Sequence, residues 1–127
     1  MAFTVSRVVP ILRIFDEQRA RDFYLGYLGF TVDWEHRIDG TGPLYLQISR
    51  ANLVLHLSEH HEDGTGGQVV YVSATGVREF HAELQTKEYE NLNPALDASP
   101  GLHLAGTCLI LLDPFGSTLR IDERPPA

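Results

Sequence analysis

The sequence predicts an α+β fold of two tandem βαβββ modules, at about residues 5–62 and 66–124 of a single domain. The first observation is that two amphipathic helical stripes each follow an apolar strand and precede further strand-like segments. The second is a weak internal repeat, in which one stripe matches the other after a shift of 57 positions (20 to 77). The matched pairs are Ala20 with Val77, Phe23 with Phe80, Tyr24 with His81, and Tyr27 with Leu84. A chain of 127 residues is long enough to enclose both units around one core.

The first module opens with an apolar, β-branched segment at residues 8–15, which predicts a strand. Pro10 lies within it and donates no backbone hydrogen bond, so we expect this strand at the edge of a sheet. Asp16 is placed to cap the next helix, because its carboxylate can accept from the free amides of the first turn. Apolar residues at 20, 23, 24, 27 and 28 predict an amphipathic helix that ends at Gly29.

Three strand-like segments follow, at residues 30–37, 44–50 and 52–58, with the turn Asp39–Pro43 after the first. The second and third alternate between leucine or isoleucine and other side chains. This alternation predicts an antiparallel meander with one face packed on the helix and a second, mixed face. In the first segment, one face is expected to carry Val32, Trp34 and His36.

The pattern then begins again in the second module. Residues 68–73 predict a strand, and the stripe over residues 77–84 predicts a second helix. Residues 107–112 and 117–122 predict two strands joined by the turn Asp113–Gly116. A further short strand is expected at residues 92–96, inside a stretch rich in Pro, Asn, Asp and Gly.

Composition excludes several classes of function. Ten basic against seventeen acidic residues give a net charge of −7, with no basic stripe to neutralise the phosphates of a nucleic acid. No apolar run approaches the ~20 residues of a membrane span, and the N-terminus lacks the pattern of a signal peptide. Cys108 is the single cysteine, so no internal disulfide is expected. These observations predict a soluble, cytoplasmic protein without a nucleic-acid or membrane partner.

A histidine-rich stretch contains four potential metal ligands, His56, Glu59, His60 and His61. Metal ligands must converge on one point, whereas neighbouring His60 and His61 point apart in an extended segment. The spacing therefore favours a solvated loop at residues 59–64, with a ligand-gating or dimer-contact loop as the alternative. His56 lies within a strand, where it is either hydrogen-bonded beneath this loop or a polar group in a ligand groove.

Other side chains interrupt the predicted strands. Trp34, His36, Tyr45 and Gln47 form an amphipathic aromatic set, of the kind that lines small-molecule pockets or packs at an interface or in a core. Arg13 and Arg120 are costly to bury unless paired, and are expected to pair with Asp122 or Glu35 or to hold an anionic part of a ligand. Cys108 has no neighbouring histidine in sequence, which favours a structural thiol. No Ser-His-Asp arrangement, phosphate-binding loop or pair of carboxylates indicates a catalytic residue.

Three motifs, within Asp16–Phe30, Leu53–Ser58 and Asp113–Leu119, occur in an order that resembles the vicinal oxygen chelate superfamily. This superfamily includes glyoxalases, extradiol dioxygenases, fosfomycin-resistance enzymes and bleomycin-resistance proteins. The runs Val32–His36 and Leu55–His61 are most similar to the bleomycin-resistance branch. The resemblance implies that the two modules form a glyoxalase-like, cupped mixed sheet.

The resemblance also identifies the positions at which the superfamily's metalloenzymes hold their metal. They correspond to Val9 on the first strand, Gln68 at the start of the second module and Arg120 on the last strand. Val9 cannot coordinate a metal, and the permanent charge of Arg120 would repel one. The resemblance therefore implies no metal and no cofactor.

By resemblance, the chain is expected to be a metal-free binding protein of the bleomycin-resistance type. It would sequester a drug or metabolite in clefts of a homodimer, and its negative charge suits a cationic glycopeptide antibiotic. The expected ligand-binding residues are Trp34, His36, Tyr45, Gln47, His56 and Arg120. One alternative is a metal-dependent lyase, isomerase or dioxygenase that recruits its metal through His56, Gln68 and the acidic loop. The other is a partner-binding module without a small-molecule role.

Overall fold

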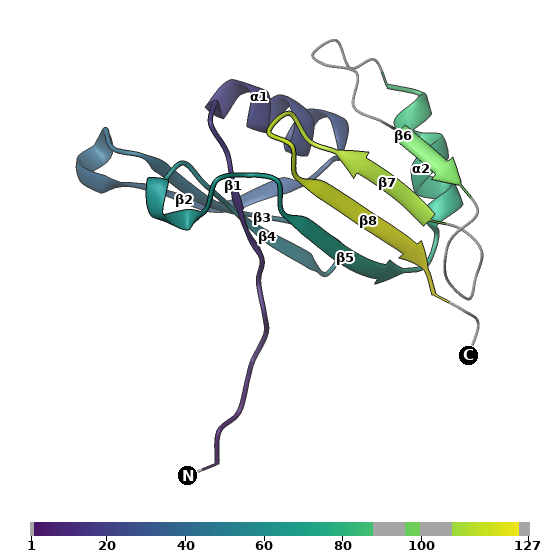
Figure 1. Cartoon of the computed structure of the whole chain (residues 1–127), viewed down its shortest axis with the longest axis horizontal. Helices are drawn as coiled ribbons and strands as arrows, with labels where there is room; N and C mark the ends of the chain where they lie inside the picture. Colours follow the sequence, from purple (N-terminus) through teal and green to yellow (C-terminus); the bar gives the residue numbers. More distant parts are fainter. Residues whose placement is uncertain (1, 88–95, 100–107, 125–127) are drawn as a thin grey trace.

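The computed structural model describes residues 2–87, 96–99 and 108–124, whose strands form two four-stranded sheets (Figure 1). Sheet A consists of β1 (Ile11–Arg13), β4 (Leu53–Ser58), β3 (Leu44–Arg50) and β2 (Thr31–Arg37), in that order. Sheet B consists of β5 (Val69–Ala74), β8 (Thr118–Glu123), β7 (Cys108–Leu112) and β6 (Leu96–Ser99). Two neighbouring pairs are parallel, β1 with β4 in sheet A and β5 with β8 in sheet B. The other pairs are antiparallel. The predicted α+β fold with a βαβββ repeat is therefore confirmed. The strand expected at residues 92–96 lies outside the described residues except for Leu96, which begins β6.

The first helix begins where the sequence predicted but changes its geometry halfway. Asp16 caps α1 (Glu17–Arg21), since its Oδ1 accepts from the amide of Arg19 at 3.0 Å. The chain then continues as the π-helix η1 (Asp22–Tyr27), in which residues five apart are hydrogen-bonded. Gly29 ends it with φ of +79°, as expected. The second helix, α2 (Val77–Gln85), also matches its prediction, and two short 3-10 turns are η2 (Ile38–Gly40) and η3 (His61–Asp63).

The first strand lies at the edge of sheet A as predicted, but it is shorter than the expected residues 8–15. In the parallel ladder, the carbonyl of Pro10 accepts from the amide of His56 at 2.9 Å. If the ladder continued, the N–H of residue 10 would donate to the carbonyl of Val54, but proline has no N–H. The ladder therefore stops, and residues 2–10 extend away from the sheets as an N-terminal arm (Figure 1).

The prediction that Val32 shares a face with Trp34 and His36 was wrong. A β-bulge lies between Val32 and Trp34, so that Val32 pairs with Ile48 while Trp34 pairs with Gln47. The extra residue, Asp33, reverses the alternation. Val32 consequently packs against the core, and Trp34 lies on the opposite face.

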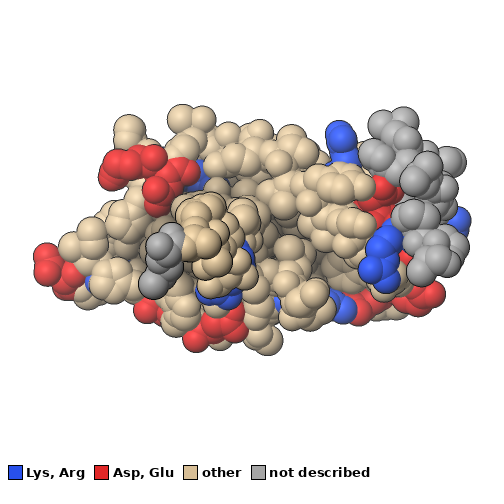
Figure 2. Space-filling view, turned by 90° about the horizontal axis from the view of Figure 1, so that it is seen from below, with Lys and Arg blue, Asp and Glu red and all other residues tan. Residues whose placement is uncertain are grey.

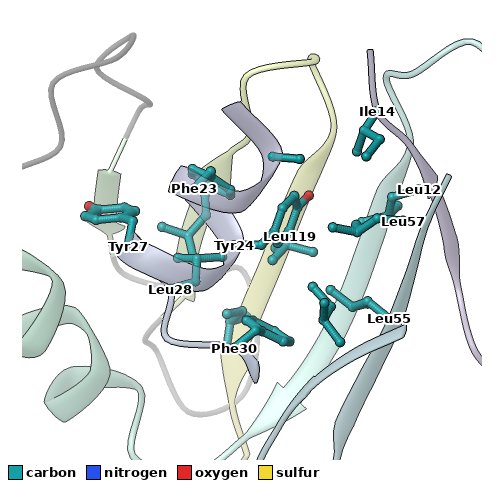
Figure 3. Packing of buried hydrophobic residues seen from close by; sticks show 14 of the residues in the cluster. Leu12, Ile14, Phe23, Tyr24, Tyr27, Leu28, Phe30, Leu55, Leu57 and Leu119 are labelled. Atoms are coloured by element: carbon teal, nitrogen blue, oxygen red, sulfur yellow. The ribbon is translucent and has the colours of Figure 1, made fainter. Parts of the chain in front are cut away.

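The core lies between the first helix and the two sheets (Figure 3). Side chains from η1, among them Phe23 and Tyr24, lie beside Leu119 of β8 and face the leucines of β4. Phe23, Tyr24 and Leu28 are completely buried. A helix from the first module thus packs against strands of both modules, and the two sheets share one core.

Candidate functional site

The polar and aromatic side chains of sheet A gather on the face opposite the leucines. The register places Trp34 opposite Gln47, His36 opposite Tyr45, and Gln47 opposite His56. Trp34, Tyr45 and His56 are in ring contact, and we call these three residues the aromatic platform. The mixed face that was predicted for the meander is therefore present, and the bulge at Asp33 places Trp34 on it.

The rings of the platform are arranged around Tyr45. The indole of Trp34 is stacked on the phenol ring, with centroids 6.0 Å apart and planes inclined by 9°. The imidazole of His56 meets Trp34 edge-on at 5.3 Å and Tyr45 at 5.2 Å. Trp34 keeps 44% of its surface exposed. The platform thus offers a solvent-accessible aromatic surface on a fixed support.

A chain of hydrogen bonds fixes the protonation of His56. The amide nitrogen of Gln47 donates to the carboxylate of Asp33 at 3.0 Å, because a carboxylate only accepts. The amide oxygen of Gln47 then accepts from Nε2 of His56 at 3.0 Å, so the proton of the neutral ring is on Nε2. Nδ1 must accept, and the hydroxyl of Tyr45 donates to it at 2.7 Å. Both ring nitrogens are therefore occupied by protein groups.

The electrostatic surroundings of the platform favour its neutral form. Burial, and secondly the positive charge of Arg7, lower the pKa of His56 below its ordinary value. Burial, and secondly the charge of Asp63, raise the pKa of Tyr45. Of the two interpretations of His56, the hydrogen-bonded histidine agrees with this geometry.

The remaining two predicted site residues lie further out. His36 is exposed on β2, and within the described residues no hydrogen bond or ring contact joins it to the platform. Arg120 lies in sheet B, where β8 places it opposite Tyr71 and Ile110. The structure therefore brings Trp34, Tyr45, Gln47 and His56 into one cluster, and leaves Arg120 on the other sheet.

Two residues that the sequence did not single out belong to this network. Arg7, from the N-terminal arm, donates to the amide oxygen of Gln47 at 3.1 Å. Asp33 accepts from Gln47 and, through its other oxygen, from the hydroxyl of Ser49 at 3.0 Å. No sequence pattern marks the contacts of either residue. Those of Arg7 depend on the path of the arm, and those of Asp33 depend on the bulge.

The acidic loop is held by hydrogen bonds on the protein side, which the expectation of a simply solvated loop did not include. Oε1 of Glu59 accepts from the amide of Leu44 at 2.9 Å, and the hydroxyl of Ser58 donates to Asp63 at 2.6 Å. The ring of His60 lies edge-on to Tyr45 at 6.0 Å. Within the described chain, no group of three or more His, Cys, Asp or Glu side chains is arranged to hold a metal ion.

The expectation that Arg13 pairs with Asp122 or Glu35 was wrong. Arg13 donates to the backbone carbonyls of Gly64 at 2.8 Å and His61 at 3.4 Å, and its guanidinium lies over the ring of Phe15. Glu35 instead forms an ion pair with Arg21 at 3.1 Å. Carbonyl oxygens accept from Nη1 of Arg13 in place of a carboxylate, whereas its buried Nε has no hydrogen-bond partner among the described residues. Cys108 is buried, and burial raises the pKa of its thiol, as a structural role predicts.

The cavity between the two modules does not include the platform. It has a volume of about 510 Å³ and lies between α2, the end of η1 and the ends of β4 and β5, on the core side of the sheets.

On the side from which the arm projects, Figure 2 shows basic side chains scattered singly and acidic ones toward the rim. No helix in the described residues is both long and apolar enough to cross a membrane.

Comparison with known proteins gives a consistent result. A model described as a glyoxalase superfamily protein matches residues 2–126, whereas no curated protein matches the sequence. Among solved structures, the chain is similar to TnmS3, an antibiotic binding protein from Streptomyces sp. CB03234 (21% identity, TM-score 0.73). It is also similar to bleomycin-binding proteins in complex with bleomycin (22%, 0.70) and, from Streptomyces verticillus, with copper(II)-bleomycin (20%, 0.70). The alignments cover 98%, 95% and 98% of this chain, respectively, and 100% of each of those chains. At these identities the similarity establishes the shared fold.

Proposed function

The chain belongs to the glyoxalase superfamily, and on this premise we propose that it binds a small molecule on the aromatic platform without transforming it. It would act as a metal-free, antibiotic-sequestering protein of the bleomycin-resistance type. Its two modules would form one domain, and its working form would be a homodimer. Three structural neighbours are themselves antibiotic- or bleomycin-binding proteins, which supports this class of ligand.

The observation that carries this proposal is the stacking of an exposed Trp34 on Tyr45, with planes only 9° apart. A flat aromatic surface provides a large contact area for a planar ligand at low entropic cost. The hydrogen bonds from Tyr45 to His56 and from His56 to Gln47 hold this surface rigid, so little order must be imposed on binding. Because those bonds occupy both ring nitrogens of His56, its part in binding would be to hold Tyr45 and to contact the ligand through the ring.

Two of the side chains that the enzyme alternative needs as metal ligands, Gln68 and His56, already have protein partners. Oε1 of Gln68 accepts from the hydroxyl of Ser117 at 3.1 Å, and its Nε2 contacts the carbonyl of Ile11 at 3.4 Å. Both nitrogens of His56 are likewise engaged. Metal analysis of protein purified without an affinity tag tests this point. Stoichiometric zinc, manganese or iron would favour the enzyme.

The homodimer rests on two open surfaces. The N-terminal arm leaves Phe3 91%, Val5 59% and Val8 85% exposed. The ladder of β1 stops at Pro10, and β5 is an edge strand. Among the described residues, the apolar side chains of the arm and the edge of β5 therefore lack cover within one chain. We propose that a second copy covers them. Sedimentation should give a dimer for the full chain and a monomer after deletion of residues 2–9. Full-length Arg7→Gln, which keeps the apolar arm, should remain dimeric.

Isothermal titration with bleomycin tests the ligand class. Binding is expected to weaken about tenfold in Trp34→Ala, because a ring contact with the ligand contributes ~0.5–1.5 kcal/mol in addition to the apolar area that it buries, and about 1.4 kcal/mol is tenfold. The control is Ile38→Ala, which removes an apolar side chain of similar exposure (48%) outside the platform. Absence of heat at tens of micromolar ligand would remove bleomycin as the ligand. Equal loss in both variants would remove the platform as the site.

A further inference from the structure

We infer that the cavity between the modules is a second small-molecule site, separate from the platform, for a neutral and mainly aromatic or alicyclic ligand. Its volume of about 510 Å³ falls within the ~300–1,000 Å³ typical of ligand pockets. It lies on the core side of the sheets, whereas the platform is on the opposite face. The inference therefore does not depend on the proposed function.

The floor of the cavity is apolar and belongs to both modules. Side chains from the C-cap of η1 and from β4, β5 and β8 contribute to it, namely Leu28, Leu53, Val72, Leu119 and Ile121, with Phe30 beside them. These residues line the space but do not fill it. Unfilled apolar space loses dispersion contacts on each wall, and a ligand of matching character would restore them.

The internal repeat explains why the space exists. In the first helix, Phe23 and Tyr24 are completely buried and fill the core between the sheets. Their counterparts in the repeat, Phe80 and His81, are only partly buried, and Phe80 lines the cavity. The second helix thus closes its side of the core less completely than the first. Leu28, Phe30 and Phe80 line the space that is left, which favours an aromatic or alicyclic ligand.

Among the described residues, the cavity lining carries two basic side chains, Arg50 and Arg124, and two acidic ones, Glu79 and Glu83, and this balance favours a neutral ligand. Arg50 is held by both oxygens of Glu83 at 2.8 Å and by the carbonyl of Leu28 at 2.7 Å. At the amino end of α2, the amide of Val77 already donates to a carboxylate oxygen of Glu123 at 3.0 Å. An anion would meet these carboxylates, and a cation would compete with Arg50. Polar groups of a neutral ligand can instead reach the exposed ends of β4 and β5.

Methyl NMR of the full chain, titrated with 2-naphthol, tests this inference. The methyl resonances of Leu53, Val72 and Ile121 should shift together and saturate. Those of Ile11 and Val69, which are exposed elsewhere, should not move. Shifts confined to Ile11 and Val69, or no saturable shift within the solubility of the probe, would overturn the inference.

Two filling variants and one control complete the experiment. Val72→Phe places an aromatic ring in the cavity and should abolish the saturable shifts, and Ala74→Leu offers a milder filling if the first variant does not fold. Retention of the shifts in a folded filling variant would also overturn the inference. Trp34→Ala should bind 2-naphthol at the cavity as the wild type does, so failure of the platform and failure of the cavity are separately visible.

Discussion

Tyr24 and Asp113 are joined in the core by a hydrogen bond of 2.7 Å, from the phenolic hydroxyl to carboxylate oxygen Oδ2. The contact links the first helix to the turn before β8. The other carboxylate oxygen accepts from the amides of Phe115 and Ser117 at 2.9 and 2.8 Å. Burial raises the pKa of Asp113, and the hydrogen bond from Tyr24 opposes that rise. The buried carboxylate therefore accepts hydrogen bonds from donors in both modules.

Tyr24→Phe should lower the free energy of unfolding by about 1–3 kcal/mol, because it removes the donor to Oδ2 in a buried setting. Urea unfolding at pH 7 measures the change. In an Asp113→Asn background, the same substitution should cost less, because the acceptor has changed. Equal costs in the two backgrounds would show that the hydrogen bond does not stabilise the fold.

His56 should titrate below its ordinary pKa of 6.5, because burial and then Arg7 disfavour its charged form. Its contribution to stability is therefore present above pH 6.5 and is lost as the pH falls through the lower folded-state pKa. NMR titration gives the midpoint, and nitrogen shifts should report a proton on Nε2. Arg7→Gln should raise the midpoint toward 6.5 without reaching it, since burial remains. A wild-type midpoint at or above 6.5 contradicts the prediction.

Gly29→Ala should destabilise the protein by at least about 1–2 kcal/mol, since φ is +79° and an added Cβ would lie 2.6 Å from Nη1 of Arg50. The matched control is Gly26→Ala, on the exposed side of η1, where a Cβ meets nothing within 4 Å. Alanine there should be neutral or stabilising by about 0.5–1 kcal/mol. Thermal unfolding of the two variants separates the effects, and similar melting temperatures would contradict the argument.

Glu83 should contribute to acid stability, because its hydrogen bond with Arg50 lowers its pKa from 4.5 to about 2. The contribution is present above pH 4.5 and is lost as the pH falls through about 2. The pair is partly exposed, so the loss should be only about 0.5–1 kcal/mol. Unfolding between pH 5 and 2 should show this component in the wild type and in Glu79→Gln. It should be missing in Glu83→Gln, and its persistence there would assign it to another group.

Alternation and capping made most of the fold predictable. Leu44, Leu46 and Ile48 were expected on the face toward the helix, and all three are buried. Asp16 and Gly29 mark the ends of the first helix because their roles depend only on local backbone geometry. Such features depend only on a few neighbouring residues, so they can be recognised in a single sequence.

The features that escaped prediction depend on contacts distant in the chain. The bulge at Asp33 changes which face Val32 occupies, and nothing in the local pattern marks one extra residue. The contact between Arg7 and Gln47 joins positions 40 apart and requires the path of the arm. Arg13 finds backbone carbonyls in place of the expected carboxylates for the same reason. The candidate site was therefore predictable as a set of side chains, but its hydrogen-bond network was not.

The parallel pairing in each sheet has a consequence for the order of folding. β2, β3 and β4 are consecutive and pair through short turns, whereas β1 pairs with β4 across 45 positions (Ile11 with His56). Closing the longer loop costs more entropy, so we expect the meander to form first and β1 to join it late. Pulse-labelled hydrogen exchange should protect Ile48 before Leu12, and the reverse order would contradict this sequence of events. A newly made chain would then hold its N-terminal segment free until the end of folding, when a neighbouring molecule can compete for it.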